Sequence, residues 1–123
     1  MRRIAMLALA ITMAGCSTDA TGPFGSVAGT YSLERINGSR LPYTFSNGVT
    51  LVSDELTLFR DGTYEDVSEY ASGSPRVERG YYENNDGAVF LQPEFSSEEY
   101  QGSVSGRVLT LFVNGFTQTF ERR

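Results

Sequence analysis

The sequence predicts an all-β domain, folded as an antiparallel up-and-down barrel of about eight strands. From residue 27 onward, short runs that alternate apolar and polar residues are separated by glycine, asparagine or aspartate about every 8–12 residues. No window of the chain shows a convincing helical repeat. Successive runs are joined by tight turns, which favour a meander, and closing the meander into a barrel leaves no sheet edge exposed.

The expected strands follow the chain in order, each bounded by residues that favour turns. Their ranges are 29–36, 41–45, 49–52, 55–59, 63–70, 76–84, 88–92, 100–105 and 107–113, followed by a last strand after residue 115. Residues 49–52 either form a short strand or lead into the next one. Pro42 weakens the second range because proline donates no ladder hydrogen bond. An immunoglobulin-like sandwich is the alternative, but it needs long connections, and only two loops could help.

The last hairpin is the best defined element, because Asn114-Gly115 stands between two alternating apolar runs. A two-residue turn there brings three cross-strand pairs onto one face: Val113 with Phe116, Leu111 with Gln118, and Leu109 with Phe120. Most of these side chains are large and apolar, so we expect this face to be buried. Phe112 points to the opposite face, where it is a candidate contact residue.

The N-terminal segment has the layout of a secretion signal. Arg2-Arg3 precedes an apolar run from Ile4 to Met13, which is too short to span a bilayer and is expected to be helical. Residues 17–26 are small, polar and typical of a flexible tether. The alternatives are a helical cap on a soluble domain and ordinary secretion with a free cysteine.

Met13-Ala14-Gly15-Cys16 resembles the lipobox of bacterial lipoproteins, with methionine in place of the usual leucine. The resemblance implies cleavage before Cys16, a diacylglyceryl group on its sulfur and acylation of its new α-amine. Two or three acyl chains anchor a protein firmly, whereas one chain binds only marginally. We therefore expect a signal peptide (1–15), a tether with lipidated Cys16 (16–26) and a barrel (27–123). Ser17 resembles the class sorted to the outer membrane, so the expected location is the bacterial envelope, on the outer membrane facing the periplasm.

Six short motifs follow one another along residues 27–123: Gly29-Thr30-Tyr31, Leu56-Thr57-Leu58, Asp61-Gly62-Thr63-Tyr64, Gly80-Tyr81-Tyr82, Leu109-Thr110-Leu111 and Phe120-Glu121-Arg122. Together they resemble the small lipocalin-like domains found behind a bacterial lipobox. Lipocalins open with Gly-x-Trp and close with a basic residue packed on that indole. Here Tyr31 replaces the tryptophan. The resemblance implies that Arg122 covers the Tyr31 ring and closes one barrel end, a cation–π contact of about 0.5–2 kcal/mol.

Composition argues against several classes of function. The 123 residues include no histidine and one cysteine, and every methionine precedes Cys16, so histidine bases, histidine-bound zinc and an internal disulfide are excluded. The 15 acidic residues exceed the 10 arginines, which argues against nucleic acid and anionic lipid as direct partners. Three sets of acidic or amide side chains are interpreted as solvated loops, strands or turns rather than as catalytic or calcium sites: Glu65, Asp66 and Glu69; Glu94, Glu98 and Glu99; and Asn84, Asn85 and Asp86. We expect no enzyme, cofactor or metal site.

Two functions remain. In the first, the barrel holds a small apolar ligand, lined by Leu56, Leu58, Tyr64, Leu109, Leu111, Phe116 and Phe120. In the second, the core is filled and an outer patch with Phe112, Tyr81 and Phe90 contacts an envelope protein. The expected partners are thus the membrane through Cys16, a small hydrophobic ligand, and possible protein contacts in the envelope.

Overall fold

The computed structural model describes residues 25–123, and these residues fold into a single antiparallel sheet of ten strands. In chain order they are β1 (Gly29–Ile36), β2 (Ser39–Arg40), β3 (Tyr43–Thr44), β4 (Thr50–Leu58), β5 (Thr63–Tyr70), β6 (Arg76–Asn85), β7 (Ala88–Pro93), β8 (Tyr100–Ser105), β9 (Val108–Val113) and β10 (Phe116–Arg122). Within residues 25–123 no helix is long and apolar enough to cross a membrane. The predicted all-β class is confirmed. The expected signal peptide (1–15), Cys16 and nearly all of the tether lie outside the described residues.

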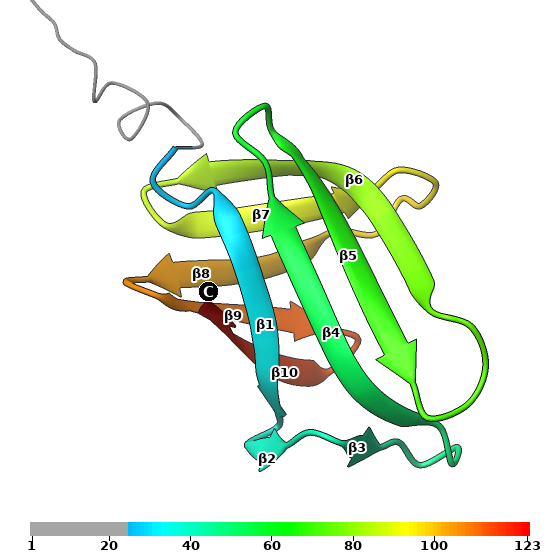
Figure 1. Cartoon of the computed structure of the whole chain (residues 1–123). Coiled ribbons are helices and arrows are strands. Elements are labelled where there is room, and N and C mark those ends of the chain that lie inside the picture. The colour runs from blue at the N-terminus through cyan, green and yellow to red at the C-terminus, as the bar shows by residue number, and fades with distance from the viewer. Residues whose placement is uncertain (1–24) are drawn as a thin grey trace, which may run out of the picture.

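The sheet closes into the predicted barrel because β1 pairs with both β10 and β4. The neighbour order follows the chain from β4 to β10, so the eight long strands form an up-and-down barrel (Figure 1). The short strands β2 and β3 extend from its rim. A closed ladder satisfies the backbone hydrogen bonds of every long strand, which removes the exposed edges of an open sheet.

Two details differ from the sequence-based expectations. The expected ranges 49–52 and 55–59 form one strand, β4, whose pairing with β5 shifts between Leu51 and Ser53. The expected strand 41–45 is reduced to the two residues of β3, and β2 precedes it as a strand that was not expected. The proline ahead of β3 accounts for its short pairing, because proline cannot donate to a ladder.

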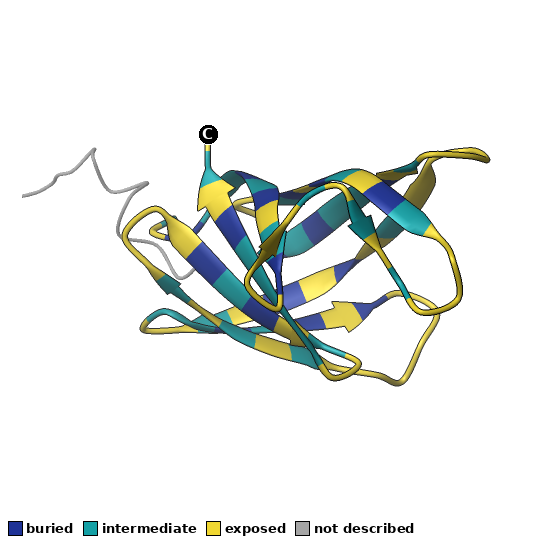
Figure 2. Ribbon diagram, turned by 90° about the horizontal axis from the view of Figure 1, so that it is seen from below, coloured by how far each residue is buried: buried dark blue, intermediate teal, exposed yellow. Residues whose placement is uncertain are grey.

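Side chains of the long strands alternate between the interior and solvent, as the banding in Figure 2 shows. The three predicted pairs of the last hairpin are all present, joined by Asn114-Gly115. On that hairpin Leu109, Leu111 and Phe120 are buried, and Phe112 faces outward with 55% of its surface exposed. Alternation in the sequence therefore predicts which face of this hairpin packs into the core.

Consecutive antiparallel strands place the turns alternately at the two ends of the barrel. We call the end where β1 begins and β10 ends the sealed end; it also carries the turns 59–62, 86–87 and 106–107. We call the other the open end; it carries the segment 37–49, the loops 71–75 and 94–99, and the Asn114-Gly115 turn.

Large side chains and hydrogen bonds close the sealed end. Tyr31 is fully buried and donates a hydrogen bond through Oη to the carbonyl oxygen of Val27 at 2.7 Å. Tyr82 donates in the same way to the carbonyl oxygen of Phe59 at 2.7 Å. Val27 is 2% exposed, so the residues just before β1 plug this end.

The expected contact between Arg122 and Tyr31 is present at the sealed end. Arg122 Cζ lies 5.2 Å from the centroid of the Tyr31 ring, and Nη2 donates a hydrogen bond to Tyr31 Oη at 2.8 Å. The same nitrogen donates to the carbonyl oxygen of Ser26 at 3.2 Å. A Cβ at Gly29 would lie 3.2 Å from Arg122 Nε, so glycine leaves room for the guanidinium.

Candidate functional site

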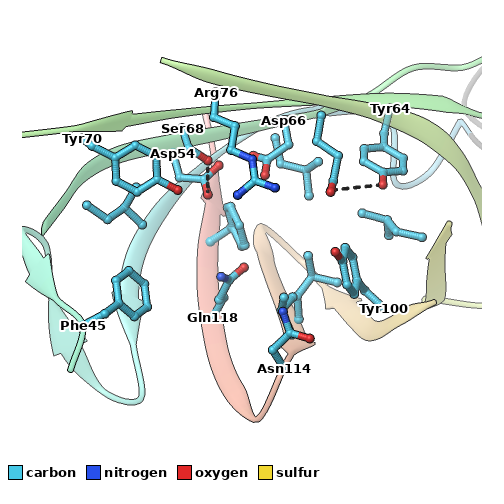
Figure 3. Close-up of a pocket in the computed structure, with 17 residues that line it drawn as sticks. Phe45, Asp54, Tyr64, Asp66, Ser68, Tyr70, Arg76, Tyr100, Asn114 and Gln118 are labelled. Carbon is cyan, nitrogen blue, oxygen red and sulfur yellow. Dashed lines mark hydrogen bonds between the residues drawn. The ribbon is translucent and has the colours of Figure 1, made fainter. Parts of the chain in front are cut away.

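A cavity of about 180 Å³ occupies the open end of the barrel (Figure 3). Strands β4, β5 and β6 supply one wall, and β9 and β10 supply the opposite wall. Phe45, Tyr70 and Asn114 stand at its rim, because each belongs to a loop or a strand end at the open end. The sealed end lies at the other end of the same barrel, so the interior can be entered from one side.

Charged side chains project into the barrel from three neighbouring strands. The strand register aligns them in two rows: Asp54, Ser68 and Arg76 in the outer row, and Leu56, Asp66 and Glu78 in the row below. All six residues line the cavity. We call the five polar members, which exclude Leu56, the polar wall. An interior face of this kind departs from the apolar filling expected of a small barrel.

Asp54 and Asp66 form a buried carboxyl pair within the polar wall. Asp54 is 5% exposed, and its Oδ2 accepts a hydrogen bond from Ser68 Oγ at 3.2 Å. Oδ1 of Asp54 and Oδ1 of Asp66 are both buried, and apart from the hydrogen bond between the two carboxyl groups neither atom has a donor among the described residues. The pair thus keeps acceptor capacity that residues 25–123 do not fill.

Burial sets the protonation of this pair. Desolvation raises the pKa of Asp54, and it raises the pKa of Asp66 to about 10 with further help from the hydrogen bond and charge of Asp54 and the charge of Glu78. Arg76 opposes the rise at Asp66. Two carboxyl groups in contact do not both ionise readily, and this repulsion favours a proton shared between Asp54 and Asp66.

Tyrosines surround the inner part of the polar wall. Tyr64 donates a hydrogen bond through Oη to Glu78 Oε1 at 3.3 Å, and desolvation raises the pKa of both groups. Burial and the charge of Glu78 raise the pKa of Tyr100 to about 12. The Tyr64 ring packs over Gly80 on β6, where a Cβ would lie 2.7 Å from Tyr64 Cε2. Glycine at this position therefore determines where the Tyr64 ring lies.

Apolar side chains complete the cavity. Its lining includes the aliphatic and aromatic residues Phe45, Leu51, Leu56, Leu91, Leu111, Val113 and Phe120. At the rim, Tyr43, Phe45 and Phe116 form an edge-to-face cluster, with Phe45 and Phe116 centroids 5.4 Å apart. The segment that carries Phe45 is tied to β10, because Asn37 Oδ1 accepts a hydrogen bond from the Thr117 amide at 2.8 Å. The rim is thus held by packing and hydrogen bonding.

The structure places the seven expected ligand-binding residues in three regions. Leu56, Tyr64, Leu111 and Phe120 line the cavity. Leu58 and Leu109 are 1% and 0% exposed and belong to the packed core outside the cavity lining. Phe116 packs on the aromatic cluster at the rim.

Of the five residues of the polar wall, only Asp66 is singled out from the sequence. Asp66 was considered with Glu65 and Glu69, but these three do not converge, because Glu65 pairs with Arg79 on the outer surface at 2.9 Å and Glu69 is exposed. Asp54, Arg76 and Glu78 were not considered. One signal was available: Asp54 shares alternation with Leu56 and Leu58, whose side chains face the core.

Two other features of residues 25–123 bear on function. Within this part of the chain no group of three or more aspartate, glutamate, histidine or cysteine side chains is arranged to hold a metal ion. On the outer surface, Tyr81 and Phe112 are 60% and 55% exposed, and Phe90 is partly buried.

Comparison with known proteins found no matching family model, curated protein or solved structure. The barrel and its cavity are therefore the basis for a functional assignment.

Proposed function

We propose that this chain is a bacterial envelope lipoprotein, anchored to the outer membrane through acylated Cys16, whose barrel holds a small ligand at its open end. The observation that carries the ligand-binding part is the polar wall inside the barrel. A buried acceptor without a donor costs about 1–3 kcal/mol, and apolar side chains at these positions would avoid that cost. A ligand that donates hydrogen bonds to these carboxyl oxygens would give the buried carboxyl pair a function.

The cavity limits the size and character of the ligand. A volume of about 180 Å³ corresponds to about six water molecules and is below the ~300–1,000 Å³ of sites for drug-sized ligands. Its lining combines aliphatic and aromatic side chains with carboxyl groups and tyrosine hydroxyls. We therefore propose a small amphipathic ligand in place of the purely apolar one expected from the sequence.

The position of the anchor favours a ligand taken from the aqueous side. The tether leads into β1, which begins at the sealed end, and Ser26 is held there by Arg122. An acylated Cys16 would join the membrane to the sealed end through this tether, so the open end is the end that carries no anchor. In this proposal the ligand enters from the periplasm and does not pass directly from the bilayer.

Native mass spectrometry of the full chain extracted from bacterial membranes tests both parts. The expected covalent mass equals residues 16–123 plus acyl groups, with an additional small molecule bound non-covalently. Gln118→Trp is the matched control, because Gln118 lines the cavity and a larger side chain there would occupy it. That variant should keep the acyl groups and lose the bound molecule. An unprocessed or unacylated chain would refute the anchor, and wild-type protein without any bound molecule would refute the ligand.

Contact with an envelope protein remains a second candidate function. Phe90 and Phe112 both pair with Gln101 across the outer surface, so the two aromatic side chains lie in one row. A photo-crosslinking residue at position 112 should capture a partner in intact cells if this face is an interface, while the same residue at exposed Glu69 should not. Equal labelling at both positions would exclude a specific interface.

A further inference from the structure

The acceptors of the polar wall select for a ligand that donates hydrogen bonds. Asp54 Oδ1 and Asp66 Oδ1 are buried with no donor among the described residues except the other carboxyl of the pair, and both residues line the cavity. A carboxyl pair offers several lone-pair positions, so the single proton that it shares does not fill them. An ammonium group has three donors and no acceptor, which matches this arrangement.

The charge of the wall also favours a cation. Asp54 and Asp66 supply two carboxyl groups, and Glu78 adds a third, which accepts a hydrogen bond from Tyr64. Arg76, at the exposed start of β6, supplies one positive charge. The wall thus holds three carboxyl groups against one guanidinium, and an organic cation bound among the carboxyl groups would favour their ionised forms.

Aromatic rings on several sides of the cavity provide a second attraction for a cation. Phe45, Tyr70, Tyr100 and Phe120 line the same space as the carboxyl pair. Ring faces attract ammonium groups, and the attraction strengthens when water is excluded. A metal ion fits less well, since hard cations need six or more oxygen ligands and residues 25–123 offer no group of three candidate metal-binding side chains.

We propose that the cavity binds a small organic amine in its ammonium form, with the ammonium group on Asp54 and Asp66 and the apolar body against Leu111 and Phe120. This inference rests on the proposed function, because it names the ligand class of the same cavity. Arg76, at the entrance of the cavity, then repels the positively charged ammonium group. Its removal should strengthen binding, whereas loss of a wall carboxylate should weaken it.

Three probes that share one ring separate the possible ligand charges. Benzylammonium, benzyl alcohol and benzoate are titrated into the detergent-solubilised full chain at pH 7, with binding followed by NMR of the probe. We expect benzylammonium to bind at least about tenfold more tightly than benzyl alcohol, as charge-assisted hydrogen bonds are worth about a factor of ten or more. Benzoate should not bind. Gln118→Trp corrects for probe that dissolves in the detergent.

Matched variants test whether the preference for benzylammonium comes from the polar wall. Asp54→Asn should weaken benzylammonium binding about tenfold or more, and Arg76→Gln should strengthen it. Glu69→Gln removes an exposed carboxylate from the outer face of β5 and should leave binding unchanged. If Asp54→Asn fails to fold, as judged by circular dichroism, Arg76→Gln and Glu78→Gln still test opposite signs in the same site.

The outcomes distinguish this inference from the proposed function. Equal or tighter binding of benzyl alcohol, or benzoate binding that Arg76→Gln abolishes, would overturn the ammonium inference and leave a ligand-binding barrel. Failure of all three probes to bind would also overturn it. The native mass measurement then decides independently whether the barrel carries any ligand.

Discussion

The two ends of this barrel differ in where their buried polar side chains point: into a packed cap at one end and into a cavity at the other. At the sealed end, the hydroxyl groups of Tyr31 and Tyr82 donate to backbone carbonyl oxygens, and Arg122 is bonded to Tyr31 and to the backbone of Ser26. At the open end, Asp54 Oδ1 and Asp66 Oδ1 are buried, and their only donor among the described residues is the other carboxyl of the pair. Arg122 Nε at the sealed end is also buried without a partner among the described residues, but Arg122 does not line the open-end cavity, whereas both carboxyl groups do. The comparison assigns stability to the sealed end and binding to the open end.

The largest expected effect concerns the tyrosines at the two ends. Tyr31→Ala should lower the free energy of unfolding by about 3–5 kcal/mol, because it empties a fully buried site and frees Arg122. Tyr70→Ala, at the rim of the open end, should lower it by less than about 1 kcal/mol, since the side chain is only partly buried. Urea unfolding followed by circular dichroism measures both. Equal losses would contradict the division of roles between the ends.

A medium effect is expected for the residue that covers Tyr31. Arg122→Ala removes the cation–π contact and the hydrogen bond to Tyr31 Oη, so we expect a loss of about 1–2 kcal/mol in unfolding free energy. Arg107→Ala is a suitable control, because that exposed arginine donates a hydrogen bond to the backbone carbonyl oxygen of Arg122 and does not contact Tyr31 through an aromatic or hydrogen-bonding interaction that the structure shows. A loss at Arg122 no larger than at Arg107 would mean that the cap contributes nothing specific. Urea unfolding at pH 7 gives both values.

The smallest effect, when it is taken over a single pH unit, is a pH dependence that arises at the open end. The pKa of Asp66 is raised from its usual value to about 10 by burial and by Asp54, so the folded chain binds one more proton than the unfolded chain between about pH 4 and pH 10. Stability is therefore fully present at low pH and falls as pH rises through this window, by at most about 1.4 kcal/mol per pH unit. Asp66→Asn should remove this slope. Glu69→Gln, on the outer face of the same strand, should retain it, and a slope that persists in Asp66→Asn would place its origin elsewhere.

Much of the barrel could be predicted because alternation and turn residues report directly on strands. The Asn114-Gly115 turn determined the register of the last hairpin, and the resemblance to lipocalin-like domains implied the contact between Arg122 and Tyr31. These features depend on neighbours in sequence or on one closing contact. Where a strand is regular, local pattern is enough.

The polar wall is harder to predict, because alternation counted from Leu51 and alternation counted from Leu56 and Leu58 place Asp54 on opposite faces. Leu51 faces inward, and a regular strand would then send Asp54 outward. The register shift between Leu51 and Ser53 reverses the alternation, so that Asp54 joins Leu56 on the inner face. On β6, Arg76 and Glu78 face the cavity while Val77 is 48% exposed, which inverts the usual assignment of polar and apolar residues. Neither a bulge nor an inverted strand end can be read from residue types alone.

The central claim is that the carboxyl pair serves binding and does not stabilise the barrel. The most direct test is the double variant Asp54→Asn and Asp66→Asn, measured for both urea unfolding at pH 8 and retained ligand by native mass spectrometry. We predict unchanged or higher stability, because a buried negative charge is removed, together with loss of the bound molecule. A less stable barrel that still carries its ligand would contradict the account.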